Sequence, residues 1–168
     1  MWTRPLDYES VLYVADNMRR KDRHEIAALR EPFDTVALTR DCLRAGAFAW
    51  VGGRDDRPIV VFGAWPMHPG VWSAWMFATD EFPRVALGLT KLARRVIIPS
   101  LAQSGCRRAQ CLSIEGHTVA HEWLKSLGAV EESRMEGYGK SGEAFVCFRL
   151  MLGAASHVHV RRGRRAAT

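Results

Sequence analysis

The sequence predicts one α/β domain, with a mixed, mostly antiparallel central sheet, flanking helices and a parallel crossover in its second half. Apolar residues recur at helical spacing through residues 8–45, and three short apolar runs divided by turn residues occupy 47–78. Beyond residue 83, helical and extended patterns alternate, which is typical of a parallel crossover unit. The 168 residues, 48% of them hydrophobic and 25% charged, suit a single globular domain.

Two helices are predicted after a short extended start. The first runs from Tyr8 to Arg20 and gathers its apolar side chains on one face, at Val11, Leu12, Ala15 and Met18. We interpret the charged residues 19–23 as a solvated cluster. The second helix runs from about Phe33 to Ala45, with Pro32 suited to its first turn and Gly46 to the position just past its end.

A three-stranded antiparallel meander is predicted next. Residues 47–51 and 59–65 are apolar, and the Gly- and Asp-rich residues 52–58 between them form a hairpin turn. A second turn at 66–70 leads into the third strand, 71–78. The middle of the chain therefore supplies the antiparallel part of the sheet.

A long helix from Pro83 to about Ser104 follows, and Pro99 is expected to bend it because proline lacks the amide hydrogen of a helical bond. A strand from Arg108 to Ile114 and a helix from about His117 to Leu127 come next, and Gly128 suits the left-handed position that ends a helix. This order predicts the parallel crossover.

Two last strands, Val130–Tyr138 and Glu143–Leu152, flank a Gly-rich turn and close the domain, which we place at residues 1–152. Residues 153–168 form a basic tail. Four of the six net positive charges lie there, on Arg161, Arg162, Arg164 and Arg165. The remaining +2 argues against a broad nucleic-acid-binding face, which needs many clustered cations, so the tail alone is a candidate for contact with nucleic acid or a partner.

The four cysteines predict no metal site. Cys42, Cys106, Cys111 and Cys147 form no C-x-x-C pair and have no histidine at ligand spacing, so we interpret them as small buried residues. Residues 1–5 lead into polar sequence without the apolar region of a secretory signal, and nowhere do about 18 apolar residues run together. We therefore expect a soluble protein in a reducing compartment, without a membrane span.

The order of elements resembles that of the GNAT superfamily of N-acetyltransferases over nearly the whole chain. More specifically, residues 117–129 are similar to the family's late helix, N-x-x-A-x-x-L-Y-x-x-x-G-F, with Ala120 and Gly128 in place. A closer resemblance is to GNAT-like internal virion or virion-assembly proteins of T7-like podophages, through residues 75–82, which occupy the place of their Trp-rich strand ending in T-x-D, and through residues 124–130. That resemblance implies a virion or host-cytoplasm location.

The resemblance also implies where acetyl-CoA would bind. In a GNAT enzyme the strand before the long helix splays from its neighbour and pairs with pantetheine, which assigns Phe77, Ala78 and Thr79 to the cleft. The start of the long helix, with Arg84 and Gly88, would hold the pyrophosphate through free N–H groups and the helix dipole.

Two departures from the family pattern argue against efficient acetyl transfer. The phosphate loop Q/R-x-x-G-x-G/A is replaced by residues 80–89, which contain two carboxylates, a bulky Phe82 and only one glycine. Leu124 occupies the position of the family's tyrosine acid. Glu115 or His117 could act as base by position, and Tyr138 could replace the acid if the last hairpin folded inward, while His117 could equally serve only as a helix cap.

The tryptophans Trp50, Trp65, Trp72 and Trp75 are more simply core residues than a base-stacking surface, although Trp72 and Trp75 point to opposite faces of one strand and one face could meet a protein. Two functions follow. The first is a GNAT-fold phage protein acting as a virion-associated structural component, with virion proteins bound through the tail and exposed tryptophans. The alternative is an active acetyl-CoA-dependent N-acetyltransferase with an atypical CoA site.

Overall fold

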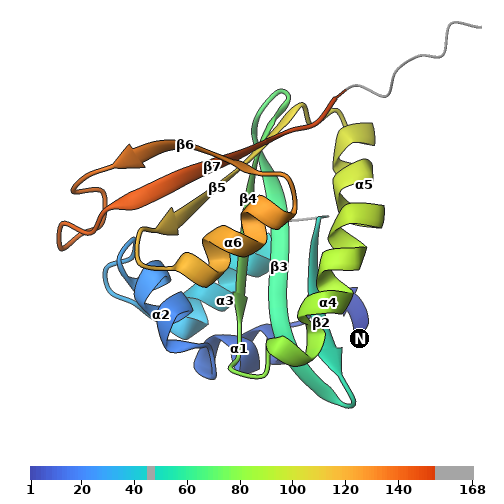
Figure 1. Ribbon diagram of the computed structural model, residues 1–168. Helices are drawn as coiled ribbons and strands as arrows, with labels where there is room; N and C mark the ends of the chain where they lie inside the picture. The colour runs from blue at the N-terminus through green and yellow to red at the C-terminus, as the bar shows by residue number, and fades with distance from the viewer. Residues whose placement is uncertain (45–47, 154–168) are drawn as a thin grey trace, which may run out of the picture.

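One seven-stranded sheet organises the chain, in the order β1-β2-β3-β4-β5-β7-β6 (Figure 1). The computed structural model describes residues 1–44 and 48–153. The strands are β1 (Trp2–Pro5), β2 (Ala49–Arg54), β3 (Arg57–His68), β4 (Val71–Ala78), β5 (Arg108–Ile114), β6 (Val130–Met135) and β7 (Phe145–Met151). Every pair of neighbours is antiparallel except β4–β5. The predicted fold class is confirmed, including the crossover that makes β4 and β5 parallel.

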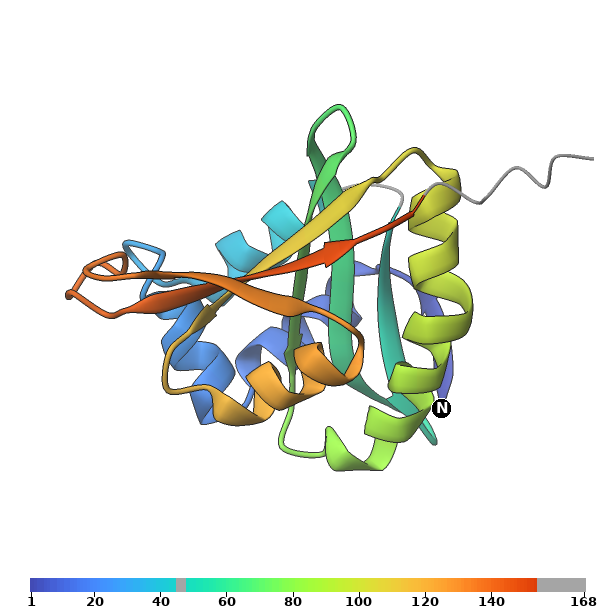
Figure 2. The same ribbon diagram turned by 45° about the horizontal axis from the view of Figure 1, so that its top comes forward.

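Helices cover both faces of this sheet (Figures 1 and 2). They are α1 (Tyr8–Asp16), α2 (Arg20–Ala27), α3 (Thr35–Arg44), α4 (Pro83–Leu92), the π-type segment η1 (Ala93–Ile97), α5 (Ile98–Gln103) and α6 (Thr118–Ser126). Alternate residues of β3 serve the two layers, because Val61 packs with α1 and α3 while Val60 and Phe62 pack with α4. No described helix has the length and apolar character to span a membrane.

The tryptophans of the meander mostly pack, as the alternation predicts. Trp72 contacts Phe48 at 5.2 Å between ring centroids on the α5 side of the sheet, whereas Trp75 lies with the core formed by α1 and α3. Trp65 is 40% exposed and lies 6.2 Å from Trp75. The opposite orientations of Trp72 and Trp75 are therefore confirmed, with both side chains packed against other residues.

Residues 19–23 form the start of helix α2, and the solvated cluster predicted there is confirmed for Arg20 and Lys21, which are exposed, but wrong for Asp22. Asp22 is only 3% exposed, lies 2.8 Å from the guanidinium of Arg19, and accepts a 2.8 Å hydrogen bond from the amide of Ala78. A carboxylate can be buried when its oxygens are paired in this way. A run of charged residues in the sequence therefore does not show which of them is buried in the fold.

The predicted helix bounds need two physical refinements. Helix α3 begins at Thr35, because the carboxylate of Asp34 accepts hydrogen bonds from Val36 and Ala37 at 3.0 and 3.1 Å, so Pro32 lies before the helix. In the long helix, the amide of Ile98 bonds the carbonyl of Ala93, which places the irregular turn directly before Pro99. The predicted end of α3 at residues 45–46 lies outside the described residues.

The closing hairpin is confirmed, although its strands are shorter than predicted, with β6 ending at Met135 and β7 starting at Phe145. Gly137 and Gly142 adopt positive φ in the loop between them. The tail arginines Arg161, Arg162, Arg164 and Arg165 lie outside the described residues.

Acid should weaken the second half of the sheet through Glu132. Its carboxylate lies 2.9 Å from Arg108 and 3.1 Å from Arg149, and the hydrogen bond from Arg108 lowers its pKa from the usual 4.5. A lowered pKa stabilises the fold above pH 4.5, and this contribution is lost as the pH falls through the folded-state value. In urea unfolding, Glu132→Gln should be less stable than wild type at pH 7, and the difference should shrink as the pH falls below 4.5, with Glu131→Gln as the neighbouring control. A deficit that does not shrink on acidification would contradict this assignment.

Candidate functional site

The candidate site is the gap that opens where β4 and β5 part. The two strands pair with each other only where residues 71–73 face residues 108–110. Beyond that point β4 continues to Ala78 and β5 to Ile114, and these two segments do not pair with each other. In Figure 1 the lower ends of the two strands diverge, with α6 crossing the gap. The splay implied by the resemblance is therefore present.

The edge of β4 turns backbone polar groups toward this gap. The amide of Ala78 donates to Asp22 and its carbonyl accepts from the amide of Arg19 at 2.8 Å, whereas the amide of Thr79 bonds Ile59 of β3. Backbone groups alternate in direction along a strand, so Met76 directs its N–H and C=O to the same side as Ala78. At Met76 the main chain thus offers its N–H as a hydrogen-bond donor and its C=O as an acceptor to a ligand in the gap.

Two cavities adjoin at the gap. An apolar chamber of about 140 Å³ lies on the side of α4, α5 and α6, and a larger cleft of about 580 Å³ lies on the side of α2 and α3. Residues from β4, β5 and α6 line both of them, namely Ala74, Trp75, Met76, Cys111, Trp123 and Leu124. A molecule in the gap would therefore contact both cavities.

Buried charged groups gather on the cleft side, where His117 lies between two carboxylates of α2. The Nδ1 atom of His117 is 3.1 Å from Glu25, and its Nε2 atom is 3.5 Å from Asp22. His117 is 5% exposed, and burial raises the pKa of Asp22 above 3.8 although Arg19 opposes the shift. Because an ionised carboxylate can only accept, Nδ1–H donates to Glu25, whereas the 3.5 Å from Nε2 to Asp22 is longer than an ordinary hydrogen bond.

The two carboxylates also hold the parted strand ends. Asp22 accepts the amide of Ala78 on β4, while Glu25, three residues later, accepts the amide of Ile114 at 2.8 Å and the hydroxyl of Ser113 at 2.7 Å on β5. Sequence reasoning missed both residues. Their spacing of three on a helix was the available signal, since it places both on one face.

Of the predicted catalytic residues, the structure brings only His117 to the cleft. Its side chain contacts Glu25 and makes no capping bond at the start of α6, so the interpretation of His117 as only a cap is wrong. Glu115 is exposed and paired with Arg134, and Tyr138 is 47% exposed beside Phe145. Neither Glu115 nor Tyr138 lines the two cavities within the described residues. Their catalytic roles stay predictions.

The predicted cofactor residues fall into two groups. Phe77, Ala78 and Thr79 lie at the open end of β4, but the side chain of Phe77 is buried under α1 and the backbone of Ala78 already bonds Asp22 and Arg19. Arg84 lies on the exposed start of α4, paired with Asp55 at 2.8 Å and with Glu81, and Gly88 faces Met1. Their contact with a cofactor stays a prediction.

The start of α4 does not fit a pyrophosphate in this conformation. The amides of Phe82, Arg84 and Val85 donate to carbonyls of the same turn, at 3.0 Å each. The carboxylate of Glu81 lies there too, with its pKa lowered by the hydrogen bond from Arg84. A helix start binds phosphate through free amides, and these are occupied.

One buried donor on β4 has no partner, and the ring that carries it lies over Gly63 of β3. The indole nitrogen of Trp75 is buried and unbonded within the described residues, and Trp75 lines both cavities. Leaving such a donor without a partner costs free energy, and a ligand with an acceptor oxygen would satisfy it.

The sheet order, the splayed pair and the two helical layers are those of the GNAT acetyltransferase fold. The chain superimposes on the ribosomal-protein-S18-alanine N-acetyltransferase of Escherichia coli with a TM-score of 0.67 and 13% identity, covering 94% of this chain and 97% of that one. Ard1 of Thermoplasma volcanium gives 0.69 and 14%, covering 90% and 97%. yncA of Salmonella typhimurium, described as a candidate acetyltransferase and solved with acetyl-CoA, gives 0.65 and 17%, covering 93% and 96%.

No protein-family profile matches the chain, and no curated protein matches it by sequence. At these identities the structural likeness defines the fold, and the activity has to be argued from the site.

Proposed function

We propose that this protein is a GNAT-fold N-acyltransferase that moves an acyl group from a thioester donor to an amine, with an atypical CoA site. The observation that carries the proposal is the parted β4–β5 pair, which exposes the main chain of Met76 beside the buried cluster of His117 and Glu25. Charged groups held in a buried cluster next to a cleft are typical of catalytic sites.

The two halves of acetyl-CoA fit this site differently. The thioester half is compatible with the gap, where Met76 offers main-chain groups. The pyrophosphate half has no free amides at the start of α4. We therefore expect affinity to come mainly from the pantetheine and acyl parts of the donor.

The residues of the chain have distinct roles in this proposal. Acetyl-CoA would supply the activated acyl group. The N–H of Met76 polarises the carbonyl, and Nε2 of His117, oriented by Glu25 at Nδ1, takes the proton that the amine loses. Leu124 supplies no acid where the family has tyrosine, so the departing thiolate takes its proton from solvent.

Thiol release tests this function directly. The protein is mixed with acetyl-CoA and a panel of amines, including lysine, peptides with free N-termini and small aromatic amines, and free thiol is followed with a chromogenic disulfide. Release that requires both protein and amine is expected. Release at the uncatalysed rate with every amine would overturn the proposal.

A second candidate is the virion-associated component of a podophage, with the fold kept for its surfaces. The occupied amides at the start of α4 and Leu124 in the tyrosine position favour it, together with the resemblance at residues 75–82. Its partners would be virion proteins reached through the arginine-rich tail and Trp65, and the tail could touch nucleic acid. Mass spectrometry of purified particles tests this candidate, since absence of the protein would remove its main support.

A further inference from the structure

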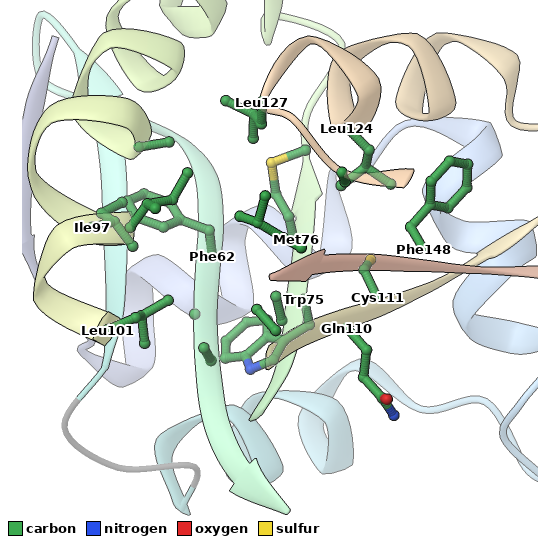
Figure 3. A pocket seen from close by; sticks show the side chains of 18 of the residues that line it. Phe62, Trp75, Met76, Ile97, Leu101, Gln110, Cys111, Leu124, Leu127 and Phe148 are labelled. Carbon is green, nitrogen blue, oxygen red and sulfur yellow. The ribbon is translucent and has the colours of Figure 1, made fainter. Parts of the chain in front are cut away.

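The apolar chamber beside the gap lies between the sheet, the long helix and α6 (Figure 3). Side chains from all three converge on it, including Phe62 and Met76 of the sheet, Ile97 and Leu101 of the long helix, and Leu124 of α6. This hollow of about 140 Å³ is partly open and almost wholly apolar, so without an occupant its lining leaves hydrocarbon surface in contact with water. Such a chamber is therefore expected to have an occupant.

The lining selects against a polar occupant. No charged side chain lines the chamber within the described residues, and Gln110 is the only side-chain amide there. The amide nitrogen of Gln110 lies 3.2 Å from the sulfur of Met67, and its oxygen lies 3.4 Å from Arg108, so both ends are directed elsewhere. A group rich in amides, such as pantetheine, would find no side-chain partners inside.

Direct contacts between α6 and the long helix narrow one side of the chamber. The indole nitrogen of Trp123 donates to the hydroxyl of Thr90 at 2.9 Å, and Arg94 donates to the carbonyl of Ser126. The ring of Phe82 also packs edge-on against Trp123, 6.5 Å between centroids. On the other side the chamber meets the cleft at the gap, where Met76 and Trp75 line both cavities, and a ligand in the gap can reach the chamber there.

We infer that the chamber is a binding site for a short hydrocarbon chain, the acyl group of a donor that carries about four to six carbons. The inference rests on the proposed function for the identity of the donor. The size follows from comparison with a dry cavity of about 150 Å³ that binds benzene, a molecule of six carbons. With the thioester at Met76, the chain extends into the chamber and the amine approaches from the cleft.

Calorimetric titration with acetyl-, butanoyl-, hexanoyl- and decanoyl-CoA tests the inference. Burial of each methylene group is expected to tighten binding about fourfold, so hexanoyl-CoA should bind on the order of a hundredfold more tightly than acetyl-CoA, with no further gain for decanoyl-CoA. Equal affinity for acetyl- and hexanoyl-CoA would overturn the inference and leave the proposed acyl transfer intact.

A second readout is independent of CoA. Benzene is titrated into methyl-labelled protein and the resonances of Ile97, Leu101, Leu124 and Leu127 are followed. Shifts confined to these methyl groups would support the chamber as a hydrocarbon site even if no acyl-CoA bound, in which case only the proposed function would fail. The absence of shifts would count against the site.

Filling variants connect both readouts to the chamber. Ala93→Leu on η1 and Ala109→Val on β5 add carbon atoms to its lining, and we expect them to abolish the chain-length preference and the benzene shifts while raising the melting temperature. Val96→Leu, on the exposed side of the same helix, is the matched control and should retain both. Unchanged chain-length preference in both folded filling variants would place the acyl chain elsewhere.

Discussion

Replacing Asp22 with alanine is expected to destabilise the protein by about 3–5 kcal/mol, the usual cost of removing one partner from a buried ion pair. The variant leaves the guanidinium of Arg19, 18% exposed, without its carboxylate, and the amide of Ala78 without its acceptor. Both losses fall where α2 holds the free end of β4.

Urea unfolding at pH 7 measures this cost. Asp16→Ala is the control, because Asp16 lies on an exposed turn of α1 and should change the free energy of unfolding by less than about 0.5 kcal/mol. If the two variants were equally stable, the contacts of Asp22 with Arg19 and Ala78 would not stabilise the end of β4 as the structure indicates.

His117→Gln is expected to lower the rate of acyl transfer by roughly 10²- to 10⁴-fold, the range for loss of a general base. Glutamine retains a hydrogen-bonding amide near Glu25 but cannot take a proton from the amine. The effect should fall on kcat, with KM for the donor little changed.

His24→Gln is the matched control, since the side chain of His24 is 62% exposed and lies outside the cleft lining. It should retain the full rate. A folded His117→Gln enzyme with full kcat would exclude His117 as the base and leave it a purely structural residue.

Most of the fold could be predicted because its signals are local. The meander of residues 47–78 alternates apolar residues between clear turns, and Gly128 stands where α6 ends, with the positive φ of 94° that such a position requires. Helix α2 was not predictable in this way. Its sequence is nearly all polar, and its stability comes from contacts with β4 and β5, which are more than 50 residues away in the chain.

In the candidate site too, residues marked by a local motif could be predicted, whereas residues whose role depends on long-range contacts could not. His117 was a candidate because a local motif marks the start of the late helix, and the structure brings it to the cleft. Glu25 and Asp22 could not be assigned, since a carboxylate in a charged stretch shows its role only when the fold places it against strand ends. The chamber is likewise a property of three packed elements, and no segment encodes it alone.

Calorimetric titration with acetyl-CoA and, in parallel, with acetyl-pantetheine, which lacks the pyrophosphate, tests the central claim most directly. If the parted strands hold the thioester and the start of α4 contributes little, both ligands should bind with dissociation constants within about tenfold of each other. Heat-silent titrations with both ligands at millimolar concentration would contradict the acyltransferase and favour a fold kept for its virion contacts.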